Sequence, residues 1–193
     1  MGICGIDEAG RGPLAGPVVA AAVILPRRGR PKGLDDSKQL TAEAREELAR
    51  AIREIGIVAV GVASVAEIDE INILRASHLA MKRAFEALAE TPVAAIVDGN
   101  MAPDLPCPIE CVIDGDVIVP IVSAASIIAK VERDRMMTAL CAEYPGYGFS
   151  KHKGYGTPEH QDALARLGPC AIHRMSFKPV AAAVALRASR SAA

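Results

Sequence analysis

The feature that most constrains the fold is an uninterrupted run of eight apolar residues, Val18 to Leu25, enclosed by Pro17 and Pro26. The run is too short to cross a bilayer. Its valines, its isoleucine and its bounding prolines favour a strand that is largely buried on both faces. A shorter β-prone run, Ile3 to Asp7, precedes it, and a Gly- and Pro-rich loop lies between the two runs. We therefore predict two consecutive strands at the start of a sheet.

The rest of the chain alternates further strands with helices. Strands are predicted at Ile57 to Ala63, at Val93 to Val97 and near Glu110 to Ile113. Helices are predicted at Thr41 to Ile55, from Ser64, at Leu74 to Ala89, Pro120 to Glu143 and Pro158 to Leu167, and from about Pro179. Tyr144 to Thr157 is predicted as a loop. This pattern indicates one α/β domain over residues 1–188, and we expect residues 189–193 to be a frayed tail.

Composition narrows the classes of function. Aromatic residues make up 3% of the chain, which excludes a nucleic-acid platform made of many stacking rings. The net charge of −1 gives no overall basic field, so a polyanion needs a local basic patch. The late part of the chain offers a patch, although the same charges could be ordinary solvated groups. These residues are Lys130, Arg133, Arg135, Lys151, His152, Lys153, Arg166, Arg174 and Lys178.

The cysteines and the first residues indicate a compartment. Five cysteines occur without the spacing of a disulfide framework or of a zinc finger, so we expect reduced thiols. The first ten residues contain Asp7 and Glu8 and lack the regions of a signal peptide. We therefore expect a cytoplasmic protein with no membrane association.

Acidic residues recur where predicted strands end. Asp7 and Glu8 end the first strand, Asp98 ends the fourth, and Asp116 lies just before the long buried helix. Residues just past strand ends converge on one crevice in an open α/β sheet. Four carboxylates repel one another unless a cation lies between them, and hard oxygen ligands suit Mg²⁺ or Mn²⁺. A single acid of this kind more often just solvates the sheet edge, but the set of four predicts phosphodiester hydrolysis by two metal ions.

This prediction carries a geometric condition. Neighbouring strand residues point to opposite faces, so Asp7 and Glu8 can reach one site only if the strand ends or bulges there. Gly10 and Gly12 supply that backbone freedom. The same glycines satisfy a dinucleotide-binding pattern with Ala15, but a strand follows where that motif requires a helix, so we reject this alternative.

Six segments together resemble the ribonuclease HII family, the type 2 ribonucleases H, and they occur in the family's order. They are Gly5 to Val23, Asp36 to Thr41, Val97 to Asn100, Ser123 to Asp134, Tyr147 to Thr157 and Leu167 to Phe177. The resemblance implies a ribonuclease H-like fold: a mixed five-stranded sheet flanked by helices, with additional C-terminal helices.

The resemblance also implies a reaction and a metal site. The expected activity is endonucleolytic cleavage of RNA paired with DNA, including nicking of a DNA duplex on the 5′ side of embedded ribonucleotides. The expected ends are a 3′-hydroxyl and a 5′-phosphate. The family's catalytic, metal-binding acids correspond to Asp7, Glu8, Asp98 and Asp116, and the implied ions are Mg²⁺ or Mn²⁺.

Substrate contacts also follow from the resemblance. The family recognises the ribose through a Gly-Arg-Gly turn and a tyrosine, here Gly10, Arg11, Gly12 and Tyr155. Expected phosphate contacts that position the duplex are Ser37, Lys38, Lys151, Lys153 and Arg174. We expect a monomer, and the tail lacks the aromatic pair of a sliding-clamp motif. Two alternatives are a catalytically silent duplex-binding module and a metal-dependent phosphatase or nucleotide hydrolase.

Overall fold

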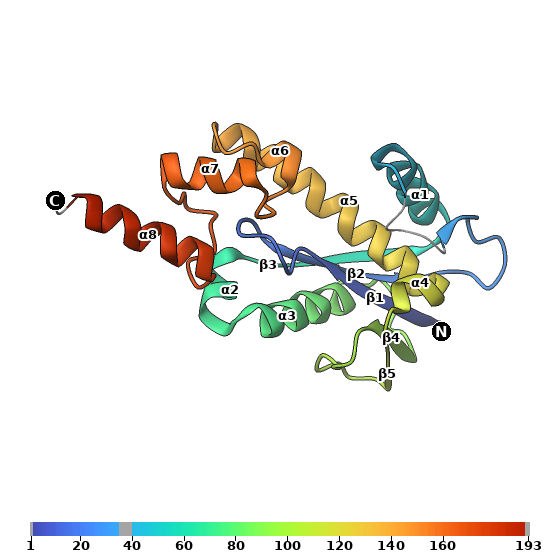
Figure 1. Cartoon of the computed structure of the whole chain (residues 1–193). Helices are drawn as coiled ribbons and strands as arrows, with labels where there is room; N and C mark the ends of the chain where they lie inside the picture. The colour runs from blue at the N-terminus through green and yellow to red at the C-terminus, as the bar shows by residue number, and fades with distance from the viewer. Residues whose placement is uncertain (1, 35–39, 192–193) are drawn as a thin grey trace.

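The computed structural model describes residues 2–34 and 40–191, and it contains a five-stranded sheet with helices on both faces (Figure 1). The strand order is β3-β2-β1-β4-β5. β1 pairs antiparallel with β2 and parallel with β4, so the sheet is mixed, as predicted. The strands are β1 (Ile3–Ala9), β2 (Val18–Ile24), β3 (Ile57–Ala63), β4 (Ala94–Asp98) and β5 (Ile109–Val112).

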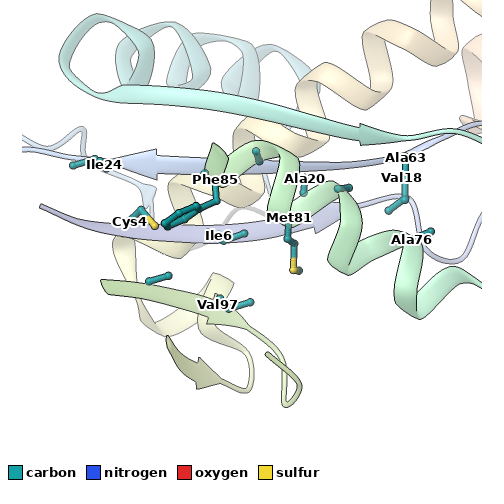
Figure 2. Close-up of a cluster of buried hydrophobic side chains, with 14 of the residues drawn as sticks. Cys4, Ile6, Val18, Ala20, Ile24, Ala63, Ala76, Met81, Phe85 and Val97 are labelled. Carbon is teal, nitrogen blue, oxygen red and sulfur yellow. The ribbon is translucent and has the colours of Figure 1, made fainter. Parts of the chain in front are cut away.

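The all-apolar run forms β2, and all seven of its residues are buried. Alternate residues face two different cores, because successive side chains of a strand point to opposite faces. Ala20 and Ala22 pack with Met81 and Phe85 of α3 (Ile73–Glu86) on one face of the sheet. Figure 2 shows Ala20, Met81 and Phe85 in this cluster. Ala21 and Val23 pack with helices on the other face. A strand covered on both faces needs no polar side chain, which explains the composition of this run.

The helices begin where the sequence offers caps. The Thr41 side chain accepts a hydrogen bond from Ala44 N, and Ser64 forms a reciprocal capping box with Glu67. The helices are α1 (Ala42–Ile55), α2 (Val65–Ile71), α3 (Ile73–Glu86), α4 (Gly115–Ile118), α5 (Pro120–Glu143), α6 (Phe149–His152), α7 (Pro158–Leu167) and α8 (Lys178–Ser191). Capping satisfies first-turn N–H groups that lack intrahelical partners.

Two segments differ from the prediction. The segment predicted as a loop between α5 and α7 contains the short helix α6. The last helix, α8, continues to Ser191, three residues past the predicted end of the domain at residue 188. No helix in the described ranges combines the length and the hydropathy that a bilayer crossing requires.

Helix α5 packs directly on β1. A Cβ atom on Gly5 would overlap the backbone of Ile121, so only glycine lets the start of α5 approach the strand this closely. The first half of α5 is buried, as its small and apolar composition predicts. This contact places the α5 residue Ser126 beside the acidic end of β1.

The connection between β1 and β2 is held by the C-terminal part of the chain. Leu14 N donates to Gly154 O at 2.8 Å, and Gly16 N donates to Ile172 O at 2.8 Å. The Leu14 side chain packs with Leu164 of α7 and with Val180 of α8. The loop that follows the acidic strand end therefore depends on segments about 150 residues further along the chain.

Candidate active site

The acidic site lies where β1 and β4 separate. The two strands are paired as far as Ile6 and Val97, and the next residues along them are Asp7 and Asp98. Such a point between neighbouring parallel strands, at their carboxyl ends, is where open sheets form ligand crevices. The predicted convergence of the β1 and β4 acids at one edge of the sheet is therefore present.

Burial and mutual repulsion both act on the β1 acids. Asp7 is buried, and its pKa is raised well above its usual value by burial and by the nearby charges of Glu8 and Asp98. A hydrogen bond from Ser126 partly offsets this rise. The pKa of Glu8 is also raised by burial and by Asp98, although Arg11 opposes the rise. These shifts show that Asp7, Glu8 and Asp98 are close enough to repel one another.

On its β2 side, β1 runs past the two acids without a break. β1 continues to Ala9, and Asp7 and Glu8 stay in regular register opposite Ala21 and Ala20. The two side chains therefore leave opposite faces of the strand. Asp7 is bonded by Ser126 of α5, whereas Glu8 forms an ion pair with Arg11 at 3.3 Å. No bulge is therefore present on the β2 side, but on the other side the pairing of β1 with β4 ends at Ile6, just before the acids.

A hydrogen bond from the Asp116 backbone connects Asp116 to Asp98. Asp116 N donates to Asp98 Oδ1 at 3.4 Å, and Asp116 is buried at the start of α4. The positive φ of Asp114, 55°, turns the chain into this helix. The structure thus brings the fourth predicted acid to the same edge of the sheet, through the connection between β5 and α5.

The four acids offer suitable ligands for a divalent metal without holding them in a ready-made arrangement. Within the described residues, no three acidic, histidine or cysteine side chains are placed to hold one ion together. The donor set nevertheless fits in kind, because it offers hard carboxylate oxygens whose repulsion a Mg²⁺ or Mn²⁺ ion would relieve. Asp7, Glu8, Asp98 and Asp116 are the residues that would hold such ions.

A hollow of about 370 Å³ adjoins the acids. It lies between the β1–β2 loop, α1, α5 and the loop after α6. Its walls include Glu8, Gly10, Gly12, Ser126, Lys130 and Tyr155. The predicted ribose-recognition residues and an acid of the cluster therefore face one cavity. Arg45 of α1 and Lys130 of α5 add two cations to its wall; Lys130 belongs to the predicted basic patch, whereas Arg45 was not predicted.

Arg174 does not occupy the position predicted for it. The side chain is fully buried, and its guanidinium donates to the carbonyls of Gly10, Arg11, Gly16 and Pro17 at 2.6–3.3 Å. Burial and the nearby Arg133 charge lower its pKa to about 9, which leaves it protonated at neutral pH. The predicted phosphate contact is corrected: Arg174 holds the Gly-Arg-Gly loop from behind.

Arg133 is a second structural cation beneath the same loop. It donates to Pro17 O at 3.0 Å, to Lys153 O at 3.0 Å and to Ala15 O at 3.2 Å. Gly10 has a φ of +99°, and a Cβ there would overlap the Arg133 side chain. The sequence placed Arg133 in a possible basic patch. No local pattern distinguishes a buried arginine from an exposed one, so its role was not predicted.

The remaining predicted contacts are exposed or partly exposed. Arg11, Gly12 and Tyr155 are exposed at the cavity, and Arg133 lies 6.0 Å from the Tyr155 ring centroid. Lys151 is exposed, and the Lys153 ammonium donates to Thr138 Oγ1 at 2.8 Å. The predicted contacts Ser37 and Lys38 lie outside the described residues.

Comparison with known proteins decides the family. The model of the family described as Ribonuclease HII matches residues 4–180. The chain belongs to the ribonuclease HII family. A ribonuclease HII from Rhizorhabdus wittichii is 60% identical over 179 residues, which are 93% of this chain and 89% of the relative. Another, from Parvibaculum lavamentivorans, is 59% identical, and the match covers 92% of this chain and 66% of the longer relative.

Solved structures agree with this membership. The ribonuclease H2 of Pyrococcus horikoshii matches with a TM-score of 0.79 at 28% identity, over 95% of this chain and 97% of that one. The ribonuclease HII of Archaeoglobus fulgidus, solved in a complex with PCNA, matches with a TM-score of 0.73 at 30% identity. The match covers 94% of this chain and 96% of that one. The ribonuclease H-like fold is confirmed, and the chain is a metal-dependent ribonuclease of a family that acts on RNA–DNA hybrids.

Proposed function

We propose that this ribonuclease HII hydrolyses the RNA strand of RNA–DNA hybrids and nicks DNA on the 5′ side of embedded ribonucleotides, with two Mg²⁺ or Mn²⁺ ions. The products are a 3′-hydroxyl and a 5′-phosphate. The observation that carries the proposal is that Glu8, which belongs to a group of mutually repelling acids with Asp7 and Asp98, lines the same cavity as the Gly-Arg-Gly loop. We place the enzyme in the cytoplasm as a monomer.

The acids are the proposed metal-binding groups. Asp7, Glu8, Asp98 and Asp116 would hold the ions, which when bound activate water and stabilise the leaving oxygen. The raised pKa values of Asp7 and Glu8 support this role, because the clustered negative charge is unfavourable without a cation.

The loops beside the acids are the proposed substrate contacts. The backbone of Gly10 to Gly12 approaches the 2′-hydroxyl, which distinguishes RNA from DNA. The exposed Tyr155 ring packs on the adjoining sugar. Lys151, Lys153, Ser37 and Lys38 contact phosphates and position the duplex without selecting its sequence.

One assay tests the proposal. A DNA duplex with one internal ribonucleotide is incubated with the wild-type protein and with Asp98→Asn, in Mg²⁺, in Mn²⁺ or in EDTA. We expect metal-dependent nicking 5′ to the ribonucleotide, and a loss of at least about 100-fold in Asp98→Asn, the scale of removing one group that stabilises a transition state. The matched control is Asp104→Asn, an exposed acid paired with Lys82 at 2.9 Å.

Each outcome separates the alternatives. Nicking that survives Asp98→Asn overturns the site assignment. Metal-independent binding of the duplex without nicking supports a silent binding module. Release of phosphate from mononucleotides alone supports a phosphatase or nucleotide hydrolase.

A further inference from the structure

Tyr155 combines an exposed ring with a fixed backbone. The residue is 44% exposed, although its own N–H donates to His152 O at 2.9 Å. Its carbonyl oxygen has two partners, Thr157 N at 2.8 Å and His160 Nδ1 at 2.9 Å. Two donors fill the two lone pairs of a carbonyl. The backbone of an exposed residue is thus bonded as fully as that of a core residue, which suits a ring that must hold one position.

The bonded partners define the tautomers of the histidines below Tyr155. Tyr155 O can only accept, so His160 Nδ1 must carry the proton and His160 Nε2 is an acceptor. At the other end of the series, Cys170 N donates to His173 Nδ1 at 2.9 Å, so His173 Nε2 carries the proton. The two Nε2 atoms are 3.1 Å apart, and the His173 proton therefore points to the His160 acceptor.

The result is one directed series of hydrogen bonds. It runs from Cys170 N through His173 and His160 to Tyr155 O, and every step has one donor and one acceptor. Both imidazoles are buried, and the Phe149 ring meets the His160 ring edge-on at 5.4 Å. Burial lowers the pKa of both histidines, that of His173 to about 4. The neutral state that the series requires is therefore the state present at neutral pH.

The charged and titratable surroundings are consistent with this state. His152 stacks on His160 at 4.5 Å, accepts from Gly154 N at 3.2 Å and contacts Tyr147 O at 2.7 Å, so both of its ring nitrogens have partners. The Cys170 thiol lies 3.2 Å from His173 Nδ1, but the single lone pair of that nitrogen already accepts from Cys170 N, so the thiol does not change the assignment.

We propose that His160, supported by His173, is a positioning residue that fixes the Tyr155 ring at the ribose-recognition cavity. The inference rests on the proposed function, because Tyr155 is taken as a substrate contact. His160 lies behind the loop and touches no reacting atom. It acts through the carbonyl oxygen of Tyr155, to which its Nδ1–H group donates a hydrogen bond.

Two amide substitutions separate this role from simple packing. In His160→Asn the amide nitrogen takes the place of Nδ1 and can still donate to Tyr155 O. In His160→Gln the amide group takes the place of Nε2, so it keeps the contact with His173 and loses the donor to Tyr155. Both variants place an uncharged amide in the same buried space, and thermal unfolding measures how much each one destabilises the fold.

The readout is kcat and duplex affinity on DNA with one ribonucleotide, at a temperature where every variant is folded. We expect His160→Gln and Tyr155→Ala each to lower kcat about tenfold with a smaller change in affinity, since a misplaced contact acts on the reaction more than on binding. His160→Asn should stay within about threefold of wild type. The double variant His160→Gln/Tyr155→Ala should be no slower than Tyr155→Ala, because residues that act as a unit are not additive.

Equal losses in the Asn and Gln variants overturn the proposal, as do additive losses in the double variant. The pairing is also tested without activity: ¹⁵N NMR of the histidine side chains should show Nδ1–H for His160 and Nε2–H for His173, and the opposite tautomers overturn it. If the wild-type protein shows the expected tautomers but does not nick the duplex, the proposed function is overturned while the hydrogen bond between His160 and His173 is supported.

Discussion

Arg174→Met removes the guanidinium that holds the Gly-Arg-Gly loop while keeping a long side chain in its place. In the native protein this group is fully buried and donates to four backbone carbonyls between Gly10 and Pro17. Methionine offers no donor, so the carbonyls of Gly10, Arg11 and Gly16 lose the Arg174 hydrogen bonds, whereas Pro17 O keeps its bond from Arg133. We therefore expect a large loss of stability and a loop that no longer holds its shape.

The expected magnitude follows from two opposing contributions. Each hydrogen bond to a charged donor contributes about 1.5–3 kcal/mol. Removing Arg174 also relieves its burial and its repulsion with Arg133, the two effects that lower its pKa. We expect a net decrease of about 4 kcal/mol in the free energy of unfolding, at the upper end for one substitution. For a chain of this size that corresponds to a fall of about 10 °C in Tm.

Urea denaturation and calorimetry measure this effect against a matched control. Arg166→Met replaces an exposed arginine of α7 whose nearest acid, Asp162, is 3.8 Å away, and such surface pairs contribute about 0–1 kcal/mol. The reasoning is refuted if Arg174→Met unfolds within about 2 °C of wild type, less than 1 kcal/mol for a chain of this size. If Arg174→Met instead has unchanged stability but binds the duplex more weakly and with less salt dependence, the original prediction that Arg174 contacts a phosphate would be supported.

Three further outcomes are expected. Gly10→Ala should lower the free energy of unfolding by at least about 3 kcal/mol through strain and overlap, whereas Gly29→Ala, with a φ of +78° and open space around it, should lose about 1 kcal/mol in the same urea titration. Burial lowers the pKa of His173 from 6.5 to about 4, so the unfolded chain protonates first as pH falls. Stability relative to His173→Gln should therefore drop by up to about 3 kcal/mol between pH 6.5 and pH 4, and a constant difference would contradict this. Lys151→Ala should weaken duplex binding and reduce the salt slope by about 1, with Tm unchanged, and an unaltered slope would argue against a phosphate contact.

The comparison with His173→Gln is needed because other groups titrate in the opposite sense. The pKa values of Asp7 and Glu8 are raised in the folded protein, so their protonation stabilises the fold as pH falls. Both proteins share this contribution, and the difference between them isolates the histidine.

Local sequence determined most of the helices and strands, whereas the strand order β3-β2-β1-β4-β5 became known only from the structure. The apolar run with prolines at both ends had to be a strand buried on both faces, and β2 is that strand. The capping residues Thr41 and Ser64 placed the starts of α1 and α2. The motif blocks identified the family, and the acids after two strands predicted the edge of the sheet at which they lie.

Tertiary structure decided which side chains face the cavity and which support it. Arg174 was predicted at a phosphate and lies buried behind the loop, Asp7 and Glu8 stay on opposite faces of a continuous strand, and the histidines form a directed pair beneath Tyr155. The physical reason is the distance along the chain over which each kind of interaction acts. Periodicity, prolines and caps act over a few residues and are visible in the sequence, whereas the partner of a charged or titratable group can lie more than 150 residues away, as Arg174 and Gly10 do.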